Sequence, residues 1–587
     1  MGNKAIYILG ISAFYHDSAA CLLKDGVVVH AVAEERLTRV KHDSSFPKQA
    51  IQSCLDSEEI TVSEINYIAY YEKPILKFDR ILNTFLNVAP RGFIPFKMAI
   101  KSWLKEKLWV VSVIRKETGY KGEIKFCKHH ESHAAASYFT SGFKHAAFLT
   151  IDGVGESATT TWGVANDNFI ETKQEIHYPH SLGLLYSAFT YYCGFKVNSG
   201  EYKLMGLAPF GKPKYSGLIK ENLITIEDDG SFKLNMQYFS YSYSLKMINQ
   251  KFCNLFGHPA RDEESEITQF YKDVASSIQK VTEELVMLMA AYVKQESKME
   301  NLCLAGGVAL NCVTNGLLQK SGIYKKIWIQ PASGDSGTAL GAALLVWHQY
   351  LRKPKEPQFD SLHLHSYLGP QSKPGESEGL LQDHHIIYEK PEPAELSKRM
   401  AHLLNQKGVI GWFEGKHEFG PRALGNRSIF ASPVFKDMQR HLNLAIKKRE
   451  GFRPFAPIVM EEYANQWFEM SAPASSSMLY TFPCRQPDKI PSCVHVDNSS
   501  RAQTLNKNDN ARVYDLLNEF YKISGYPVLI NTSFNVRGEP IVCYAIDAIK
   551  CFFNTDMDAL VLEEFLIIKK DQPDSISSKF TTSYELD

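Results

Sequence analysis

A pattern of an apolar strand, a polar turn and further strands occurs twice early in the chain, and it constrains the fold more than any other feature. Residues 5–12 are apolar and β-favouring, and segments 18–23 and 27–33 flank an Asp-Gly pair, a strong signal for a tight hairpin. Residues 147–151 are a second apolar run, cut by a glycine-rich turn and followed by a strand-like segment at 157–164. The recurrence predicts an α/β fold with a duplicated unit.

Length and charge bound the classes of protein that this chain can belong to. With 587 residues it should form at least two domains, because single hydrophobic cores stop growing near 250–300 residues. Lys and Arg number 65, as do Asp and Glu, so no global field recruits nucleic acid or membrane and any anion site must be a local cluster. The 11 cysteines include no Cys-x-x-Cys pair and indicate reduced thiols. We therefore expect a cytoplasmic protein without a nucleic-acid or membrane partner.

No segment near the N-terminus is typical of a secretory signal or a myristoylation site, because the first strand gives way at once to polar residues. The longest apolar region, residues 93–114, is interrupted by four lysines and a glutamate. It is a poor transmembrane candidate but a reasonable amphipathic helix, and we expect it to pack on the protein surface.

Composition also predicts the domain boundaries. Residues 1–355 carry the repeated pattern, and residues 356–392 are rich in proline and charge, which is typical of a linker. A second domain is expected over residues 393–570. The Ser- and Asp-rich tail, residues 571–587, is expected to be poorly ordered.

A candidate metal site is indicated by residues 128–137, Lys-His-His-Glu-Ser-His-Ala-Ala-Ala-Ser. If the alanines make this stretch helical, His129 and His133 project from one face, one turn apart. The strand 147–151 would deliver Asp152 at its C-terminal end, and imidazole with carboxylate suits Fe(II), Mn(II) or Zn(II). Taken alone, such a histidine pair is more often satisfied within a core. The zincin pattern is absent, because position 134 is not histidine.

Three glycine-bearing segments of the first domain are candidates for phosphate or nucleotide contacts. Residues 200–211 are expected to form a glycine-punctuated loop that holds one acid and one base. Residues 306–311 follow a predicted strand at 301–305, where a Gly-Gly turn lets a helix N-terminus approach a ligand, although such a turn is often plain punctuation. At residues 334–341, Asp335 should lie at the mouth of a further helix.

The second domain contains four loops in which basic and small polar residues stand beside Gly or Pro. Arginine matches the paired oxygens of phosphate, so several such loops in a neutral protein indicate a site for a polyanionic small molecule. One charge cluster alone is usually a solvated face. The loops are residues 418–428, 447–457, 495–501 and 530–540.

Taken together and in this order, the motifs resemble those of the ATP-dependent O-carbamoyltransferases, the family of the nodulation-factor, tobramycin, cephamycin and novobiocin enzymes. The resemblance covers about residues 5–569. It is carried by Leu9-Gly-Ile with His16-Asp17, Glu34-Glu-Arg with Arg39-Val-Lys-His, the His129, His133 and Asp152 set, Tyr202-Lys-Leu-Met-Gly-Leu-Ala-Pro, Gly306-Gly-Val-Ala-Leu-Asn, Phe419-Gly-Pro-Arg-Ala-Leu-Gly-Asn-Arg-Ser, Phe452-Arg-Pro-Phe-Ala-Pro and Asn531-Thr-Ser-Phe-Asn.

The resemblance implies an N-terminal actin-like domain, which is a duplicated RNase H-like ATPase fold, and a C-terminal α/β domain resembling threonylcarbamoyl-adenylate synthases. It also implies an ATP-dependent carbamoyltransferase reaction in two steps. The C-terminal domain would convert Mg-ATP and carbamoyl phosphate into carbamoyl adenylate, and the N-terminal domain would pass the carbamoyl group to an acceptor hydroxyl. The implied cofactor is one divalent metal, Fe²⁺ first, with Mn²⁺ or Zn²⁺ as alternatives.

The implied site residues follow from the motifs. The implied metal ligands are His129, His133, Asp152 and Asp335. The implied catalytic residues are His16, Lys41, Arg422 and Arg453. The implied contacts to substrate or nucleotide are Lys41, His130, Gly153, Glu201, Lys203, Gly306, Gly307, Asn311, Lys448, Arg449, Arg501, Asn531 and Ser533. One departure is the Asp-Asn-Ser-Ser sequence before Arg501, where the family pattern has Asp-Gly-Thr; it weakens the assignment of Ser499 only.

The acceptor is the least determined substrate. Residues 238–243 alternate aromatic and hydroxyl side chains, which favours an ordinary half-buried strand, with a wall for a ring-shaped polyol or amino sugar as the alternative. We expect a polar, uncharged or cationic small molecule such as a natural product, sugar or aminoglycoside-like compound, and a monomer or homodimer. Two other functions stay open: an actin-like small-molecule kinase, and a nucleotide-binding regulatory protein without turnover.

Overall fold

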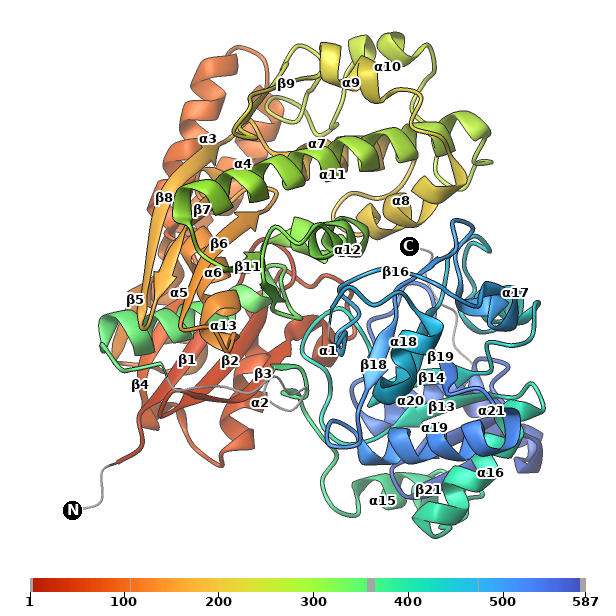
Figure 1. Ribbon diagram of the computed structural model, residues 1–587. Helices are drawn as coiled ribbons and strands as arrows, with labels where there is room; N and C mark the ends of the chain where they lie inside the picture. The colour runs from red at the N-terminus through yellow and green to blue at the C-terminus, as the bar shows by residue number, and fades with distance from the viewer. Residues whose placement is uncertain (1–3, 106, 356–364, 473, 581–587) are drawn as a thin grey trace. The chain divides into compact units, whose positions relative to one another are not determined.

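The computed structural model describes residues 4–105, 107–355, 365–472 and 474–580 (Figure 1). The chain divides into two compact units. The first comprises the chain up to Glu34 and His42–Asp360, and the second comprises Glu35–Lys41 and Ser361–Asp587. A seven-residue segment near the N-terminus is therefore part of the second unit, which the linear sequence does not indicate.

The first unit contains two five-stranded sheets with the same topology. Their strand orders are β3-β2-β1-β4-β5 and β8-β7-β6-β11-β12. In each sheet the first three strands in sequence are antiparallel neighbours, and the last two run parallel to the central strand. The strands are β1 (Tyr7–Ser12), β2 (Ala19–Lys24), β3 (Val27–Ala33), β4 (Ile65–Tyr70) and β5 (Glu123–Phe126), then β6 (His145–Ile151), β7 (Ala158–Asn166), β8 (Phe169–His177), β11 (Asn301–Ala305) and β12 (Lys326–Ile329). The predicted duplicated, actin-like arrangement is confirmed.

Local sequence explains the strands of the first sheet. Every residue of β1 is buried, as its apolar composition predicts for a central strand. The β2–β3 turn places Asp25 at φ 50° and Gly26 at φ 87°, the positive values that a type I′ hairpin turn requires at both central positions. The hairpin predicted from the Asp-Gly pair is confirmed.

Two helices that follow the fifth strand of each sheet pack against one another. They are α6 (His129–Thr140) and α13 (Ser336–Leu345), and α13 also lies on β1 and β2. Their approach depends on missing side chains: a Cβ on Gly341 would lie 1.7 Å from the Ser132 carbonyl oxygen, and one on Gly10 would lie 1.9 Å from the Ala339 carbonyl oxygen. Glycine and alanine at these positions therefore decide how closely α6, α13 and the first sheet can pack.

Two insertions enlarge the first unit. Helices α3 and α4 lie side by side in the first, and the long helix α11 dominates the second (Figure 1). None of the helices in the described part of the chain is both long and apolar enough to span a bilayer. The elements before α6 are α1 (Glu34–Thr38), α2 (Lys48–Ser57), η1 (Val62–Glu64), α3 (Pro74–Val88), α4 (Phe93–Lys105), η2 (Lys107–Trp109) and α5 (Val110–Thr118). Those after β8 are α7 (Leu182–Tyr192), α8 (Glu201–Leu207), η3 (Ala208–Phe210), α9 (Ser216–Asn222), β9 (Ile224–Ile226), β10 (Phe232–Leu234), α10 (Gln250–Phe256), α11 (Gln269–Ser297), η4 (Gly307–Leu310), α12 (Cys312–Ser321) and η5 (Val346–Tyr350).

Two local predictions are wrong. Residues 200–211 form α8 and η3 instead of an open loop, because the run Glu-Tyr-Lys-Leu-Met between the glycines consists mainly of good helix formers. Residues 238–243 form no named strand: Phe239 makes a single bridge to Ile248, and the adjoining backbone turns. Alternation alone did not suffice there, because no neighbouring strand is present to continue the ladder.

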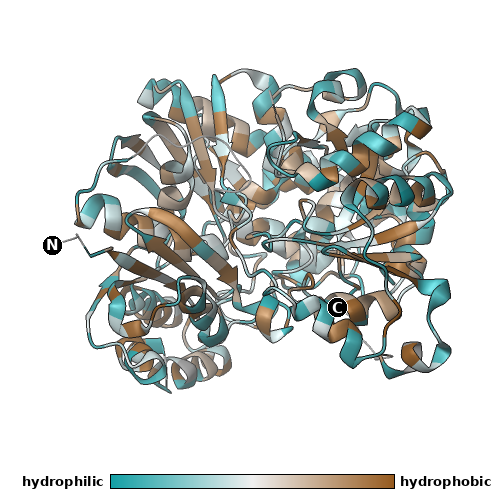
Figure 2. Cartoon of the chain, turned by 90° about the horizontal axis from the view of Figure 1, so that it is seen from below, coloured by the Kyte–Doolittle hydropathy of each residue, from teal (hydrophilic) through white to brown (hydrophobic). Residues whose placement is uncertain are grey.

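The second unit is built on a seven-stranded mixed sheet of order β18-β15-β19-β14-β13-β20-β21. Helices α16 and α19 cover one face, where Met400, Leu404, Leu516 and Phe520 pack with Trp412 in one buried cluster. Figure 2 shows the apolar residues concentrated in the strands. The strands are β13 (Val409–Phe413), β14 (Arg427–Ala431), β15 (Ala456–Met460), β18 (Gln503–Leu505), β19 (Val528–Ser533), β20 (Ala559–Leu562) and β21 (Phe565–Ile568), with a short pair β16 (Phe482–Pro483) and β17 (Ser499–Ser500).

The helices of the second unit begin within the segment expected to be a linker and extend into the expected tail. Helix α15 lies in the first of these and α21 in the second, while residues 356–364 and 581–587 lie outside the described residues. The helices are α15 (Glu376–Asp383), α16 (Pro393–Asn405), α17 (Met438–His441), η6 (Leu442–Ile446), η7 (Glu461–Tyr463), α18 (Ala464–Trp467), η8 (Pro487–Lys489), η9 (Pro491–Cys493), α19 (Ala511–Ser524), α20 (Ala545–Phe553), η10 (Lys569–Asp571) and α21 (Asp574–Lys579).

The close contact between α6 and α13 gives a stability prediction. Gly341→Ala should lower the free energy of unfolding by about 1–3 kcal/mol, because the new Cβ would collide with the Ser132 carbonyl and the backbones must separate. Urea denaturation followed by circular dichroism measures the change. Gly217→Ala, in α9 of the same unit, has no heavy atom within 3.9 Å of its Cβ and is the matched control; equal losses in the two variants would contradict the proposed packing.

Candidate functional site

Four side chains from three separate segments of the first unit meet in a buried cluster. His129 and His133 lie on the first turns of α6, Asp152 directly follows β6, and Asp335 is the N-cap residue of α13. All four are buried, with at most 7% of each residue exposed. The cluster thus unites the two helices that pack together with the end of the central strand of the second sheet.

The distances within the cluster fit a metal ion. The Nε2 atoms of His129 and His133 face one another at 3.2 Å, and Asp152 Oδ2 lies 3.2 and 3.9 Å from them. Asp335 Oδ1 lies 3.7 and 3.6 Å from the same two nitrogens. A tetrahedral ion with bonds of about 2.1 Å would separate its ligand atoms by about 3.4 Å, close to these values. Asp335 Oδ2 is buried and has no hydrogen-bond partner among the described residues, and a bound metal would compensate for its burial.

The backbone around the cluster holds its ligands in place. The Glu156 carboxylate accepts hydrogen bonds from the His129 backbone N–H, at 3.0 and 3.2 Å, and so fixes the start of α6. The Gly307 N–H donates to Asp152 Oδ1 at 2.8 Å. Gly306 has φ 89° and the Cβ of any other residue would lie 2.3 Å from the Ile151 carbonyl oxygen, so this position requires glycine.

The charge states of the cluster are strongly coupled. Burial alone would raise the pKa of Asp152, but the hydrogen bond from His129 and the charge of His133 hold it well below its usual range. Burial lowers the pKa of His129, whereas Asp152 and Asp335 raise it and prevail. The Asp152 carboxylate therefore retains its negative charge in this buried cluster, and carboxylate with imidazole is a donor set that suits a divalent cation.

His16 extends the cluster through a chain of polar contacts. Its Nε2 lies 3.6 Å from Asp335 Oδ2, and its Nδ1 lies 3.0 Å from Asp17 Oδ2. Asp17 in turn lies 2.8 Å from His42 Nδ1. Burial lowers the pKa of His16, but Asp335 and Asp17 raise it to about 10. His16 is thus oriented by Asp17 toward the cluster, a role for Asp17 that the sequence motif alone does not show.

The other residues predicted in the first unit divide into two groups. The first group lies beside the cluster or on the turn that follows β11, and consists of Gly153, Gly306, Gly307 and Asn311. The 3-10 helix η4 follows this turn, so α12 begins only at Cys312. Asn311 caps α12, because its side chain accepts a hydrogen bond from the Thr314 N–H at 3.1 Å. Glu201 and Lys203 lie on α8, where Glu201 accepts from Ser187 at 2.6 Å.

His130 is not a member of the metal cluster. Its ring nitrogens contact Thr150 Oγ1 at 2.7 Å and the Ala158 carbonyl at 2.9 Å. Burial and the neighbouring His129 and His133 lower its pKa to about 3, so its imidazole is neutral. It contributes to the wall of a cavity instead.

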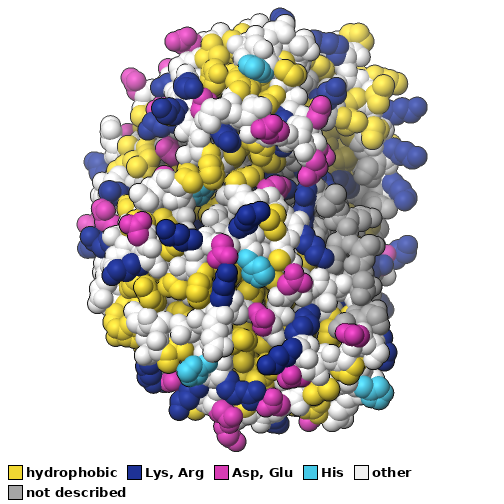
Figure 3. Space-filling view, turned by 90° about the vertical axis from the view of Figure 1, so that its right-hand side faces the viewer, with side chains coloured by type: hydrophobic (Ala, Val, Ile, Leu, Met, Phe, Trp, Pro, Cys, Tyr) yellow, Lys and Arg dark blue, Asp and Glu magenta, His cyan; other side chains and the backbone are white. Residues whose placement is uncertain are grey.

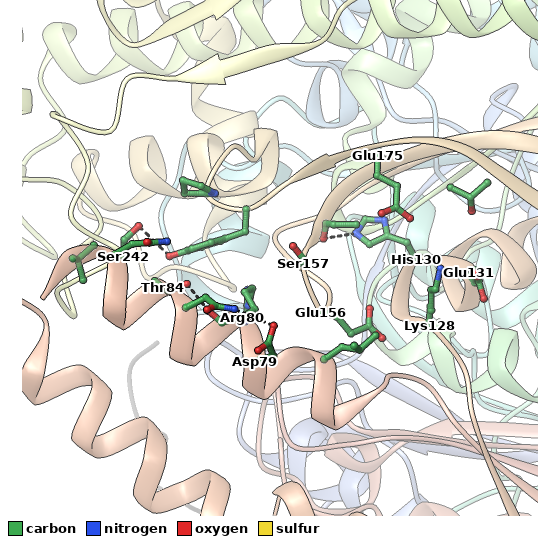
Figure 4. A pocket seen from close by; sticks show the side chains of 18 residues that line it. Asp79, Arg80, Thr84, Lys128, His130, Glu131, Glu156, Ser157, Glu175 and Ser242 are labelled. Carbon is green, nitrogen blue, oxygen red and sulfur yellow. Dashed lines mark hydrogen bonds and ion pairs between the residues drawn. The ribbon is translucent and has the colours of Figure 1, made fainter.

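This cavity, of about 500 Å³, is lined by His130 and its neighbours at the start of α6 and by residues of α3 (Figure 4). Helix α3 supplies one wall with Asp79, Arg80 and Thr84. Lys128, His130 and Glu131 supply another. Carboxylates outnumber cations among its lining residues, and the remainder includes hydroxyl and amide groups. The lining residues are Leu76, Asp79, Arg80, Asn83, Thr84, Asn87, Val88, Lys128, His130, Glu131, Glu156, Ser157, Ala158, Thr172, Glu175, Tyr178, Pro179 and Ser242.

In the second unit, basic side chains converge on a buried lysine. Lys447 is 2% exposed and donates to Ser533 and Asn535, with its Nζ 2.6 Å from both the Ser533 carbonyl and Asn535 Oδ1. Burial, followed by the charges of Arg449, Arg453 and Lys41, holds the pKa of Lys447 well below its usual range. The arrangement is a local cationic cluster in a chain of zero net charge.

The segment Glu35–Lys41 brings Lys41 to this unit. Arg36 Nη2 donates to the Gly420 carbonyl at 3.0 Å. Arg39 donates to the carbonyls of Pro540 and Ile541, at 2.8 and 2.6 Å. The segment is thus attached to two of the four predicted loops. Neither arginine was predicted as a site residue; the charged run around them was the available signal.

The remaining predicted residues of the second unit lie on or beside the same loops, with different roles. Asn531 is buried and donates to Gln503 Oε1 at 2.7 Å, and Arg453 pairs with Glu450 at 3.3 Å. Lys448 is exposed and donates to the Asn554 carbonyl at 3.2 Å. The others are Arg422, Arg449, Arg501 and Ser533, of which Arg501 carries a buried Nε without a hydrogen-bond partner among the described residues.

Two buried residues of the predicted loops, Arg427 and Lys447, were not among the predicted site residues. Arg427, quoted within the second-unit motif, is fully buried, donates to the carbonyls of Glu414 and Gly415, and packs 3.7 Å from the Phe413 ring centroid, so it supports the fold. Lys447 was overlooked in favour of its two neighbours.

On the face seen in Figure 3, basic and acidic side chains are interspersed, without an extended basic stripe.

The cluster gives a prediction about metal content. His133→Ala should lose the bound metal, because one of two imidazole ligands disappears and two carboxylates then face each other with one fewer donor. Metal content is measured by inductively coupled plasma mass spectrometry after purification, and stabilisation by added metal is measured from the melting temperature. His145→Ala, at an exposed position near α6, is the control; full metal content in the His133 variant would contradict the assignment.

Sequence comparisons match both units of the chain to known proteins. The profile of the carbamoyltransferase N-terminus matches residues 7–344, and that of the carbamoyltransferase C-terminus matches residues 401–569. An uncharacterized Synechocystis sp. protein, sll1178, is 49% identical over 99% of this chain and 100% of its own length. The nodulation protein NolNO of Sinorhizobium fredii is 35% identical over 95% of this chain and 80% of its own length.

Solved structures with weaker similarity include HypF from T. kodakarensis, at 13% identity and a TM-score of 0.30 over 60% of this chain and 48% of that one. Component A of (R)-2-hydroxyglutaryl-CoA dehydratase from Acidaminococcus fermentans gives 14% identity and a TM-score of 0.31 over 59% of this chain and 99% of that one. The two matched profiles together span most of both units. The chain therefore belongs to the carbamoyltransferase family.

Proposed function

We propose that this protein is an ATP-dependent O-carbamoyltransferase that works in two steps. In the second unit, water hydrolyses carbamoyl phosphate to carbamate and phosphate. A carbamate oxygen then attacks the α-phosphorus of ATP, forming carbamoyl adenylate and releasing pyrophosphate. The first unit then transfers the carbamoyl group to a hydroxyl of a small metabolite. The observation that carries the proposal is the presence, in a carbamoyltransferase, of two chemically different sites: a cationic cluster in one unit and a His/Asp cluster in the other.

The cationic cluster suits the first step. A carbamate is a poor electrophile until one of its oxygens becomes a good leaving group, and a mixed anhydride with AMP provides one. Arg449, Arg453, Lys41 and Lys447 supply positive charge where ATP and carbamoyl phosphate would bring negative charge. The low pKa of the Lys447 ammonium, caused by burial and by these cations, would rise again once an anion is bound.

The His/Asp cluster suits the second step. His129, His133, Asp152 and Asp335 would hold one divalent ion, for which we propose Fe²⁺, with Mn²⁺ or Zn²⁺ as alternatives. When bound, the ion would supply Lewis-acid polarisation. Around it, Gly307 orients Asp152, Glu156 fixes His129, and Asp17 presents His16 Nε2 toward the cluster for exchange of a proton with the acceptor.

The cavity beside α6 is the proposed place for the body of the acceptor. Its volume of about 500 Å³ lies within the range of small-molecule sites, about 300–1,000 Å³. Asn83, Thr84 and Ser242 provide groups that can hydrogen-bond to hydroxyls, and Asp79 and Glu175 provide charge for an amine. This lining supports a polyhydroxylated, neutral or cationic compound, such as a sugar or aminoglycoside-like molecule.

Two other functions make different demands on the same units. A small-molecule kinase would transfer the γ-phosphate of ATP and release ADP. It would have no use for the cationic cluster of the second unit. A nucleotide-binding regulatory protein would release no pyrophosphate. Incubation with Mg-ATP and carbamoyl phosphate alone separates the three, because only the proposed reaction yields pyrophosphate together with phosphate.

The division of labour between the units can be tested with two substitutions. Arg453→Ala should lower the rate of pyrophosphate release by at least about 100-fold, since one cation of the phosphate-binding cluster is removed, and should leave metal content unchanged. His133→Ala should lower the metal content and leave the rate of pyrophosphate release unchanged. A coupled pyrophosphate assay and metal analysis provide the two readouts.

Lys436→Ala, an exposed lysine of the second unit, is the matched control for loss of one positive charge. Loss of the same half-reaction in both the Arg453 and the His133 variants, with the proteins still folded, would overturn the assignment of separate steps to the two units.

The acceptor cavity gives a further test. Thr84→Trp should fill part of the cavity and abolish transfer, while pyrophosphate release and metal content stay at the level of the unmodified protein. Transfer is measured by mass spectrometry as the gain of one carbamoyl group on compounds in a low-molecular-weight extract. Leu82→Trp, on the same helix but away from the cavity lining, is the control; undiminished transfer by the Thr84 variant would place the acceptor elsewhere.

A further inference from the structure

Helices α3 and α4 form an antiparallel hairpin at the edge of the first unit (Figure 1). Phe85 of α3 stacks on Phe96 of α4 with ring centroids 4.0 Å apart, and Phe78 lies 6.0 Å from Trp103. Because the earlier residue of α3 meets the later residue of α4, the helices run in opposite directions. These four aromatic rings hold the hairpin together, so its outward surfaces are defined by the residues beside them.

On α3, a stripe of large apolar side chains lies in solvent. Ile75, Leu82 and Leu86 are separated by seven and four residues, which places them on one side of a helix. They are exposed by 75%, 36% and 61%. Around α3 the stripe lies between the ring positions Phe78 and Phe85 and the residues of this helix that line the acceptor cavity.

On α4, Phe93 and Leu104 stand in the corresponding position beside Phe96 and Trp103. Eleven residues separate them, about three helical turns, so they share one side of the helix. They are exposed by 60% and 54%. On both helices, the apolar residues are rotated by a similar angle and in the same sense from the aromatic rings that make the contact. Because the helices are antiparallel, this rotation brings both sets to the same side of the hairpin. The α3 stripe and the α4 pair therefore form one continuous apolar face.

We name this face the hairpin face: Ile75, Leu82, Leu86, Phe93 and Leu104. It gathers five exposed apolar side chains on two neighbouring helices, and contiguous patches of this kind mark sites of interaction. Ile94 and Met98 extend the apolar surface around α4.

The charge around the hairpin face is positive. Lys97, Lys101 and Lys105 are exposed on α4, and α4 contains no acidic residue. Over residues 91–107 five basic residues stand against one acid, in a chain whose net charge is zero. Lysine stems can lie along an apolar surface while their ammonium groups reach outward.

We propose that the hairpin face docks on the surface of a lipid bilayer that contains anionic phospholipids. An apolar face bordered by lysines is the pattern of helices that lie in the membrane interface, where apolar side chains enter the acyl boundary and lysines contact anionic headgroups. With 13 residues α4 is too short to cross a bilayer, so it would lie in the interface. The proposal departs from the expectation, based on global charge, that no membrane is a partner.

A second copy of the chain is the less favoured occupant. In a two-fold symmetric contact the same surface meets itself, so Lys97 and Lys101 of one copy would approach the equivalent lysines of the other without acidic residues on α4 to offset them. An anionic bilayer has the complementary charge and needs no matching apolar pocket. The proposal is independent of the reaction assigned to the protein.

The test uses the full-length protein and sedimentation with vesicles. Vesicles of phosphatidylcholine alone are compared with vesicles of phosphatidylcholine and phosphatidylglycerol in equal amounts. We expect sedimentation with the mixed vesicles only, decreasing as sodium chloride is raised, because screening weakens the contacts of the lysines. Lys97→Glu with Lys101→Glu should lower the bound fraction at least about tenfold.

The apolar contribution is tested separately by Leu86→Ser with Phe93→Ser, which should also release the protein from the mixed vesicles. The control is Lys144→Glu with Phe169→Ser, which makes one charge reversal and one apolar-to-serine change at exposed positions outside the hairpin. Circular dichroism and pyrophosphate release verify that each variant is folded.

Three outcomes would overturn the proposal. They are no sedimentation with either vesicle, equal loss in the control and the hairpin variants, and a dimer in light scattering that Leu86→Ser with Phe93→Ser converts to monomer without any change in vesicle binding. The last outcome would assign the hairpin face to a second copy of the chain.

Discussion

The close packing of α6 against α13 is the contact on which the rest of the first unit depends. Gly341 lets the Ser132 carbonyl approach where any side chain would collide. Each helix follows the last strand of one of two topologically equivalent sheets, so this contact also joins the two halves of the duplication. As a result, histidines of one half and Asp335 of the other reach a common point beside Asp152, although more than 180 residues separate Asp335 from it along the chain.

The second unit solves a different electrostatic problem. Within a chain of zero net charge, it concentrates positive charge by burying Lys447 near Arg449, Arg453 and Lys41. Burying a cation beside other cations costs stability, which is partly offset by the hydrogen bonds from Lys447 to Ser533 and Asn535. Binding of an anion would relieve the repulsion between these cations and stabilise the site. The cost of the cluster without a ligand is therefore consistent with the activation step proposed for it.

Periodicity and turn chemistry predicted the local elements well where one interaction dominates. The Asp-Gly hairpin, the buried strands β1 and β6 and the helix that carries His129 and His133 all follow from their own residues. The prediction for residues 200–211 was wrong because two glycines were given more weight than the helix formers between them. Alternation at residues 238–243 was equally insufficient, since in the described part of the chain the pairing with Ile248 stops at a single bridge and does not extend into a ladder.

The sequence by itself determined the family motifs, the duplicated strand pattern and the candidate ligands His129, His133 and Asp152, because these depend on residue identity and short spacing. Asp335 was predicted only through the resemblance to the family. Only the tertiary structure decided that His130 faces a cavity instead of the metal cluster, that Arg427 supports the fold, and that Lys447 is the centre of the cationic cluster. It also decided that Glu35–Lys41 belongs to the second unit. The physical reason is the same in each case: burial and charge at one side chain depend on neighbours that arrive from distant parts of the chain, and no local pattern records them.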